Sequence, residues 1–187
     1  MTEADWPAYY RRVAGRAVRP FAVRAAAATS PGFAVDLGCG DGTESQWLVE
    51  QGWRVLAVDR EEEAIRRVTH RTAGRAAVEC ADLANYTPPA ADLVLACAAL
   101  PFIPPDRFDD AWARIRGAVR PGGILAVELF GDRDSWAGDP GMTFHSRADV
   151  EGLTAAIEIV LLEEREFDGP SGRGPKHWHR FEVIARA

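Results

Sequence analysis

Several residues carry side chains or backbone suited to binding a nucleotide-like ligand. Residues 36–42, Asp-Leu-Gly-Cys-Gly-Asp-Gly, directly follow a short apolar run. Glycines at this spacing permit a tight turn and let the backbone approach a ligand closely. Two single acids, Asp59 and Asp82, come after later apolar runs. The pattern predicts that these three places form one binding site.

The acids suggest which ligand this site would bind. Ligands of open α/β sheets bind at the carboxyl ends of the strands. At such a position, Asp59 can accept both ribose hydroxyls of an adenosine. Asp82 can accept the adenine amino group, with Leu83 against the ring. Asp36, at the mouth of the glycine loop, would repel a pyrophosphate but favour a sulfonium or an ammonium group.

A nicotinamide dinucleotide also needs a glycine loop, so the spacing has to distinguish the two ligands. The dinucleotide fingerprint is Gly-x-Gly-x-x-Gly, with the pyrophosphate at a helix N-terminus. Counted from Gly38, its third glycine would fall at Thr43. The spacing therefore favours a ligand without phosphate, and a nicotinamide-dependent oxidoreductase stays as an alternative.

Three histidines are candidates for acid–base chemistry. His177 and His179 are two apart on an expected strand and so point to one face, with Trp178 and Arg180 on the other. His145 lies in a long expected loop. Because a histidine pKa lies near neutral pH, these side chains could serve as general bases, and we expect them to face an acceptor. Packed or surface histidines are the main alternative. A metal site is a weaker one, and no metal is expected.

Further residues are expected to line the same ligand. Tyr10 and Arg16 lie in a basic N-terminal segment, and Arg16 could pair with a carboxylate in a bidentate fashion. The alternative is a solvated arginine face with packed aromatic rings. Cys39 lies in the glycine loop, Arg60 follows Asp59 and Cys97 ends an apolar run. Cys97 is not expected to be a nucleophile, since a buried thiol lacks an activating base.

The elements that must hold these residues alternate in type along the chain. Five apolar runs predict strands at 33–37, 53–58, 76–79, 92–97 and 124–129. Helical segments are expected at 5–28, interrupted by Pro20, and at 43–51, 61–70, 106–119 and from 146 onward. Two late strands, at 157–167 and 177–185, are joined without a helix, which favours an antiparallel pair. We expect an α/β fold with a Rossmann-like, mostly parallel seven-stranded sheet and a C-terminal antiparallel hairpin.

The length of 187 residues suits one domain of ordinary size. We expect a helical cover at 1–30, a ligand-binding core at 31–130, and a loop, helix and hairpin at 131–187. The net charge of −6 argues against nucleic-acid binding. The acidic N-terminus does not resemble a signal peptide, and no run is long enough to span a membrane. Three cysteines without a Cys-x-x-Cys pair indicate reduced thiols, so we expect a cytoplasmic protein. We also expect a monomer or a homodimer.

Taken together, these features resemble a known family. Residues 35–42, Asp59, Asp82 with Leu83, and the turn at 121–123 resemble class I S-adenosylmethionine-dependent methyltransferases over about residues 33–130. Segments 6–10, 15–16, 134–136 and 176–179 are similar to small bacterial methyltransferases of the tellurite-resistance type.

The resemblance implies S-adenosylmethionine as cofactor, S-adenosylhomocysteine as product and a small-molecule acceptor methylated by in-line displacement. It also implies that the N-terminal helix of this chain covers the cofactor, as such a helix does in related enzymes. Residues 97–102 lack the Asn/Asp-Pro-Pro-Tyr/Phe sequence common in enzymes that methylate adenine or glutamine, in agreement with the acidic charge. The alternative is a non-catalytic regulatory domain that binds S-adenosylmethionine.

Overall fold

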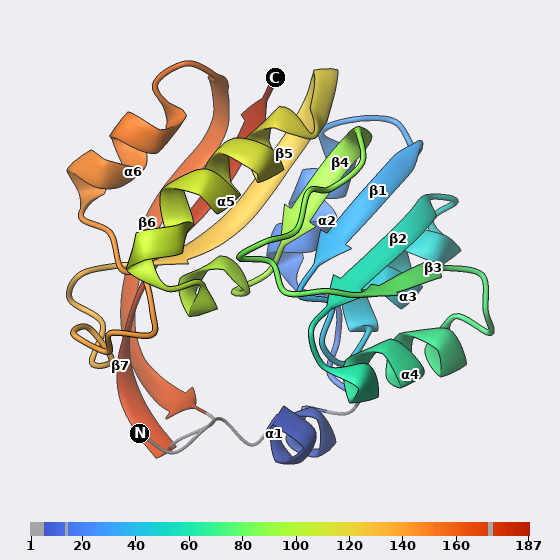
Figure 1. Ribbon diagram of the computed structural model, residues 1–187, viewed down its shortest axis with the longest axis horizontal. Coiled ribbons are helices and arrows are strands. Elements are labelled where there is room, and N and C mark those ends of the chain that lie inside the picture. The colour runs from blue at the N-terminus through green and yellow to red at the C-terminus, as the bar shows by residue number, and fades with distance from the viewer. Residues whose placement is uncertain (1–5, 14, 172–173) are drawn as a thin grey trace.

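The computed structural model describes residues 6–13, 15–171 and 174–187 (Figure 1). Asp5 and Ala14, which the sequence assigns to the N-terminal helical segment, lie outside these ranges. Within the described chain, seven strands form one sheet in the order β3-β2-β1-β4-β5-β7-β6. No helix in these ranges is long and apolar enough to cross a membrane.

Most strands of the sheet are parallel. The strands are β1 (Phe33–Leu37), β2 (Arg54–Asp59), β3 (Ala77–Cys80), β4 (Ala91–Ala96), β5 (Val119–Phe130), β6 (Glu158–Ser171) and β7 (Gly174–Arg186). Strands β1 to β5 pair in parallel, whereas β7 is antiparallel to both of its neighbours, β5 and β6. The mostly parallel sheet with an antiparallel hairpin is therefore confirmed.

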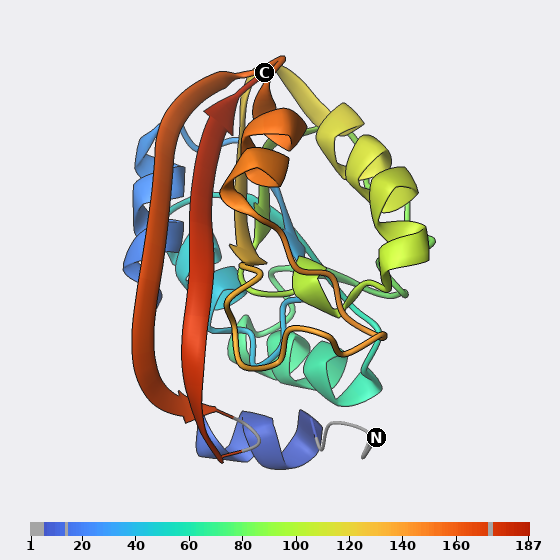
Figure 2. The ribbon, with the colours of Figure 1, turned by 90° about the vertical axis from the view of Figure 1, so that its left-hand side faces the viewer.

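Helices cover both faces of this sheet (Figure 2). The helical elements of the described chain are α1 (Trp6–Arg12), α2 (Pro20–Ala27), α3 (Thr43–Glu50), α4 (Glu62–Arg71), the 3-10 turn η1 (Leu100–Phe102), α5 (Pro105–Gly117) and α6 (Arg147–Thr154). Of these, α1 lies beyond the edge of the sheet and not on one of its faces (Figure 1). Buried residues of α5 and α6 belong to one core cluster, and those of α2, α3 and α4 belong to a second. Pro20 begins α2, as expected of a residue that fits the first helical turn.

Strand alternation explains the two cores. In β1, Val35 and Leu37 pack into the cluster under α5, whereas Ala34 packs into the cluster under α2. All three side chains are fully buried. A parallel sheet covered on both faces requires such continuous apolar strands, which is why the strands could be recognised as short apolar runs.

The hairpin of β6 and β7 is longer than the sequence suggests. Residues 168–175, with their glycines and prolines, were expected to form a connection. Instead Asp168 pairs with His177, and the pairing continues to Ser171 and Gly174. Cross-strand pairs stabilise this extension despite the poor strand propensity of its residues. The hairpin therefore reaches beyond the sheet toward α1 (Figure 1).

Candidate functional site

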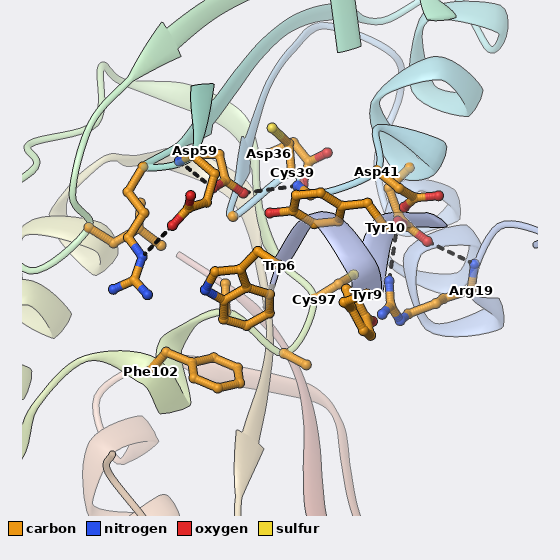
Figure 3. Close-up of a pocket in the computed structure, with 18 of the residues that line it drawn as sticks. Trp6, Tyr9, Tyr10, Arg19, Asp36, Cys39, Asp41, Asp59, Cys97 and Phe102 are labelled. Atoms are coloured by element: carbon orange, nitrogen blue, oxygen red, sulfur yellow. Dashed lines mark hydrogen bonds and ion pairs between the residues drawn. The ribbon is translucent and has the colours of Figure 1, made fainter. Parts of the chain in front are cut away.

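A cavity of about 350 Å³ opens at the carboxyl ends of the parallel strands (Figure 3). Its wall is formed by α1, the glycine loop after β1, the segments that follow β2, β3 and β4, and residues of β5 and β7. The volume falls in the range of small-ligand pockets. Its position is the one where open α/β sheets bind ligands.

The glycine loop brings backbone directly to this cavity. Gly38 has a φ of +69°, and a Cβ added there would lie 2.3 Å from the Cβ of Ala99. Its N–H donates to the carbonyl of Val58 at 2.7 Å. Any larger residue at position 38 would be strained and would clash, so glycine is required for this approach of the loop to the segment after β4.

The carboxylate of Asp59 links the end of β2 to the glycine loop. Its Oδ2 accepts from the N–H of Gly40 at 3.0 Å, and its Oδ1 accepts from the N–H of Glu61 at 3.0 Å. Burial raises the pKa of Asp59, and these two N–H groups oppose that rise. Each carboxylate oxygen can accept a second hydrogen bond, so the fixed carboxylate can still receive a pair of hydroxyls.

Asp36 lies deeper in the wall and is only 2% exposed. Its Oδ2 accepts a hydrogen bond from the hydroxyl of Ser45 at 2.5 Å. Burial raises the pKa of Asp36 to about 7, against the lowering effect of that hydrogen bond. A carboxyl group in this state responds strongly to any positive charge brought into the cavity.

Two arginines of the N-terminal segment border the cavity. Arg16 donates to Glu44 at 2.6 Å and to Asp41 at 2.8 Å, which occupies much of its guanidinium. Arg19, which was not among the residues expected to bind the ligand, lies 3.2 Å from Glu44 and 3.8 Å from Glu128. A second arginine, three residues after Arg16 and directly before the helix-starting proline, was the signal available for it.

Every residue expected to contact the cofactor borders this one cavity. They come from six separate places in the chain and are Tyr10, Arg16, Asp36, Gly38, Cys39, Gly40, Asp59, Arg60, Asp82, Leu83 and Cys97. Cys39 and Cys97 are buried thiols whose pKa is raised by burial, which fits inert packing and not nucleophilic chemistry.

Contrary to expectation, none of the three histidines borders this cavity. His177 is half-exposed and lies 2.8 Å from Asp168 and 3.1 Å from Glu166 on the outer face of the hairpin. His145 is buried, with its ring 4.6 Å from that of Phe108. Strand alternation was predicted correctly, but the face that meets the cavity is the opposite one.

His179 is fully buried behind the same face. The backbone N–H of Arg133 donates to its Nδ1 at 3.1 Å, so its Nε2 carries the proton and donates to Glu164 at 2.9 Å. Ligand atoms of Glu164, Glu166 and His179 lie within 4.8 Å of one another. However, the guanidinium of Arg133 bonds both carboxylates, so this cluster is an ion-pair network that ties the loop after β5 to β6.

The residues on the other face of β7, Trp178 and Arg180, form part of the cavity wall instead. Trp178 lies 5.6 Å from Phe130 and 5.7 Å from Trp136, measured between ring centroids. The ring of Phe102 connects this group to Trp6 of α1, at 5.1 Å. The cavity thus has an acidic, glycine-lined side near β1 and β2 and an aromatic side near β5 and β7.

The fold and the site define a class of protein. The strand order, with the antiparallel β7 between β5 and β6, combines with a glycine loop after β1 and acids after β2 and β3. This arrangement is that of the class I methyltransferases, as the sequence resemblance implied.

Comparisons with known proteins identify the family. A methyltransferase-domain model matches residues 34–123. Trans-aconitate 2-methyltransferase of Paracidovorax citrulli is 31% identical over 189 residues, covering 94% of this chain and 72% of the relative. The enzyme of that name from Acidovorax ebreus is 35% identical over 132 residues, covering 67% of this chain and 50% of the relative. The chain belongs to the S-adenosylmethionine-dependent methyltransferase family, although it spans about half the length of several curated relatives it matches.

Solved structures agree on the fold. TehB from Haemophilus influenzae superposes with a TM-score of 0.81 at 19% identity, covering 97% of this chain and 66% of that one. The N-methyltransferase NodS from Bradyrhizobium japonicum, in complex with S-adenosylhomocysteine, superposes with a TM-score of 0.68 at 18% identity, covering 97% and 99%. The family is S-adenosylmethionine-dependent, and such neighbours bind the cofactor or its product.

Proposed function

We propose that this chain, as a single domain, transfers a methyl group from S-adenosylmethionine to a small-molecule acceptor. The observation that carries the proposal is the continuity of one cavity, in which a side suited to adenosine and methionine meets an aromatic side suited to a second molecule. We also propose a cytoplasmic protein that acts as a monomer or a homodimer.

The residues of the acidic side fit the cofactor. Asp59 would accept the ribose hydroxyls, and Asp82 would receive the adenine amino group with Leu83 against the ring. Asp36 would lie toward the cationic end of the molecule. The methionine carboxylate is better assigned to Arg19 than to Arg16, because Arg16 already donates at close distance to two acids.

When bound, the cofactor supplies a methyl group on a sulfonium. The chain's contribution is to hold the acceptor in line with that methyl group and to exclude water, which can supply several kcal/mol of the barrier. Trp6 and Phe102 would close the cavity over the reacting atoms. We propose an anionic acceptor, whose nucleophilic atom has no proton to lose, so that methyl transfer to it needs no general base.

The names of the relatives support a small organic acid as acceptor class, since several are named for trans-aconitate. The alternative remains a regulatory domain that binds S-adenosylmethionine without turnover.

Two measurements test the proposal. Calorimetric titration with S-adenosylmethionine should show binding, whereas titration with NAD should not. A screen of carboxylates, thiols, phenols and tellurite for release of S-adenosylhomocysteine should then reveal an acceptor. Saturable binding without release on any acceptor would favour the regulatory domain, and binding of NAD alone would overturn the methyltransferase function.

A further inference from the structure

One guanidinium stands on the aromatic side of the cavity. Arg180 of β7 borders the cavity with a side chain 22% exposed, and its guanidinium carbon lies 3.9 Å from the ring centroid of Trp178. The ring fixes the guanidinium and covers one of its faces. The N–H groups of a guanidinium lie in its plane, so this stacking leaves their edge available.

Within the described chain, the guanidinium of Arg180 has only a distant carboxylate as its counter-charge. Its Nη1 lies 3.6 Å from Oε1 of Glu128, beyond hydrogen-bond distance, and its buried Nε has no hydrogen-bond partner in the described chain. Oε2 of the same glutamate lies 3.8 Å from Arg19. One buried carboxylate is therefore shared by two guanidinium groups, and neither makes a hydrogen bond to it.

Other cationic side chains near the cavity lie closer to a carboxylate than Arg180 does. Arg16 and Arg19 approach buried carboxylates at 2.8 and 3.2 Å. Lys176, behind the aromatic wall, lies 2.5 Å from Asp134. Beside the aromatic rings, Arg180 keeps a buried Nε–H group that has no hydrogen-bond partner among the described residues. Burying unmet donors is costly, so an anion in the cavity would be favoured at this place.

We propose that the acceptor carries one carboxylate, bound by Arg180, on a flat unsaturated or aromatic body packed against Phe102, Trp136 and Trp178. The inference rests on the proposed function and names the substrate class of the same site. A flat body matches aromatic walls, which offer large contact area and few polar groups. A tricarboxylate such as trans-aconitate would leave two further carboxylates against apolar rings, so this acceptor differs from the one for which the relatives are named.

The test compares cinnamate and cinnamamide, two probes of equal shape and different charge, and adds trans-aconitate as a third ligand. The protein is first titrated with S-adenosylhomocysteine and then, while saturated with it, with cinnamate, cinnamamide and trans-aconitate, by calorimetry and tryptophan fluorescence. We expect cinnamate to bind about tenfold or more tighter than cinnamamide, because charge-assisted hydrogen bonds to a guanidinium are stronger than neutral ones. Cinnamate should also bind more tightly than trans-aconitate.

Variants assign the effect to one residue. Arg180→Gln should abolish the preference for cinnamate over cinnamamide, and Arg180→Lys should keep only part of it, since lysine lacks the planar fork. The matched control is Arg165→Gln: Arg165 is the cross-strand partner of Arg180, but its side chain is 60% exposed and does not border the main cavity. It should keep the preference.

Several results would overturn the proposal. These are equal affinity for cinnamate and cinnamamide, no binding of cinnamate, tighter binding of trans-aconitate, or a preference that survives in a folded Arg180→Gln protein. Failure to bind S-adenosylhomocysteine would instead overturn the proposed function. In that case the same probe series on the free protein still decides whether Arg180 binds a flat carboxylate.

Discussion

Asp59 Oδ2 accepts a hydrogen bond from the backbone N–H of Gly40 at 3.0 Å, so the acid at the end of β2 is fixed to the loop at the end of β1. Two neighbouring strands thus build one half of the cavity. The carboxylate is held in place before any ligand arrives, which reduces the ordering cost of binding.

Replacing this acid should therefore weaken cofactor binding strongly. We expect Asp59→Ala to lower the affinity for S-adenosylmethionine by about 3 kcal/mol, roughly a hundredfold, since it removes charge-assisted hydrogen bonds to two hydroxyls. Calorimetric titration measures this. Glu62→Gln, on a side chain that is 83% exposed on α4, is the control and should bind as the wild type does. Unchanged affinity in Asp59→Ala would mean that the ribose is held elsewhere.

Replacing Gly38 and Gly52 by alanine should distinguish the cost of backbone strain from the cost of a steric clash. Both Gly38 and Gly52 have positive φ, but a Cβ on Gly38 would lie 2.3 Å from Ala99, whereas one on Gly52 would meet nothing within 4 Å. Gly52→Ala should lower the free energy of unfolding by about 1 kcal/mol from strain alone. Gly38→Ala should cost more and should also weaken cofactor binding. Urea unfolding and titration check this, and equal costs at the two positions would contradict it.

The buried acid Asp36 predicts a pH dependence of stability. Burial raises its pKa to about 7 in the folded protein, above the value near 4 expected in the unfolded chain. Between these values the folded state holds the additional proton, so its contribution to stability is fully present below pH 4 and is lost as the pH rises through 7. Urea unfolding from pH 5 to 8 should show this decline, and Asp36→Asn should flatten it.

The sequence was informative where function depends on neighbours in the chain. Asp59 and Asp82 follow their strands directly, and parallel strands bring their carboxyl ends to one edge. The hairpin was different. His177 and His179 alternate with Trp178 and Arg180, so periodicity separates two faces but does not say which one meets the cavity. That depends on how β7 packs beside β5, which is a tertiary property.

Arg19 could not be selected from the sequence either, because its place beside the cavity also depends on tertiary packing. Its proposed role can be tested by comparing ligands with and without the methionine carboxylate. If Arg19 binds the methionine carboxylate, Arg19→Gln should weaken binding of S-adenosylmethionine and S-adenosylhomocysteine about tenfold or more. Binding of adenosine, which lacks that carboxylate, should be unchanged. Parallel titrations with the three ligands measure the effect. An equal loss for adenosine would indicate a general collapse of the cavity.

The wall behind the aromatic side rests on one buried ion pair. Lys176 Nζ lies 2.5 Å from Asp134 and 3.5 Å from the ring centroid of Trp136, with both charged side chains almost fully buried. Lys176→Met should leave a buried carboxylate without its cation and destabilise the fold by about 3 to 5 kcal/mol. Asp134→Asn in the same background should restore part of this loss, because the uncompensated charge is then removed. Arg133→Gln, which removes partly exposed ion pairs of the same loop to Glu164 and Glu166, should cost less stability than Lys176→Met. Urea unfolding of the wild type, the single variants Lys176→Met and Asp134→Asn, and the double variant forms the cycle. Additive losses at Lys176 and Asp134 would mean that the pair does not act as a unit.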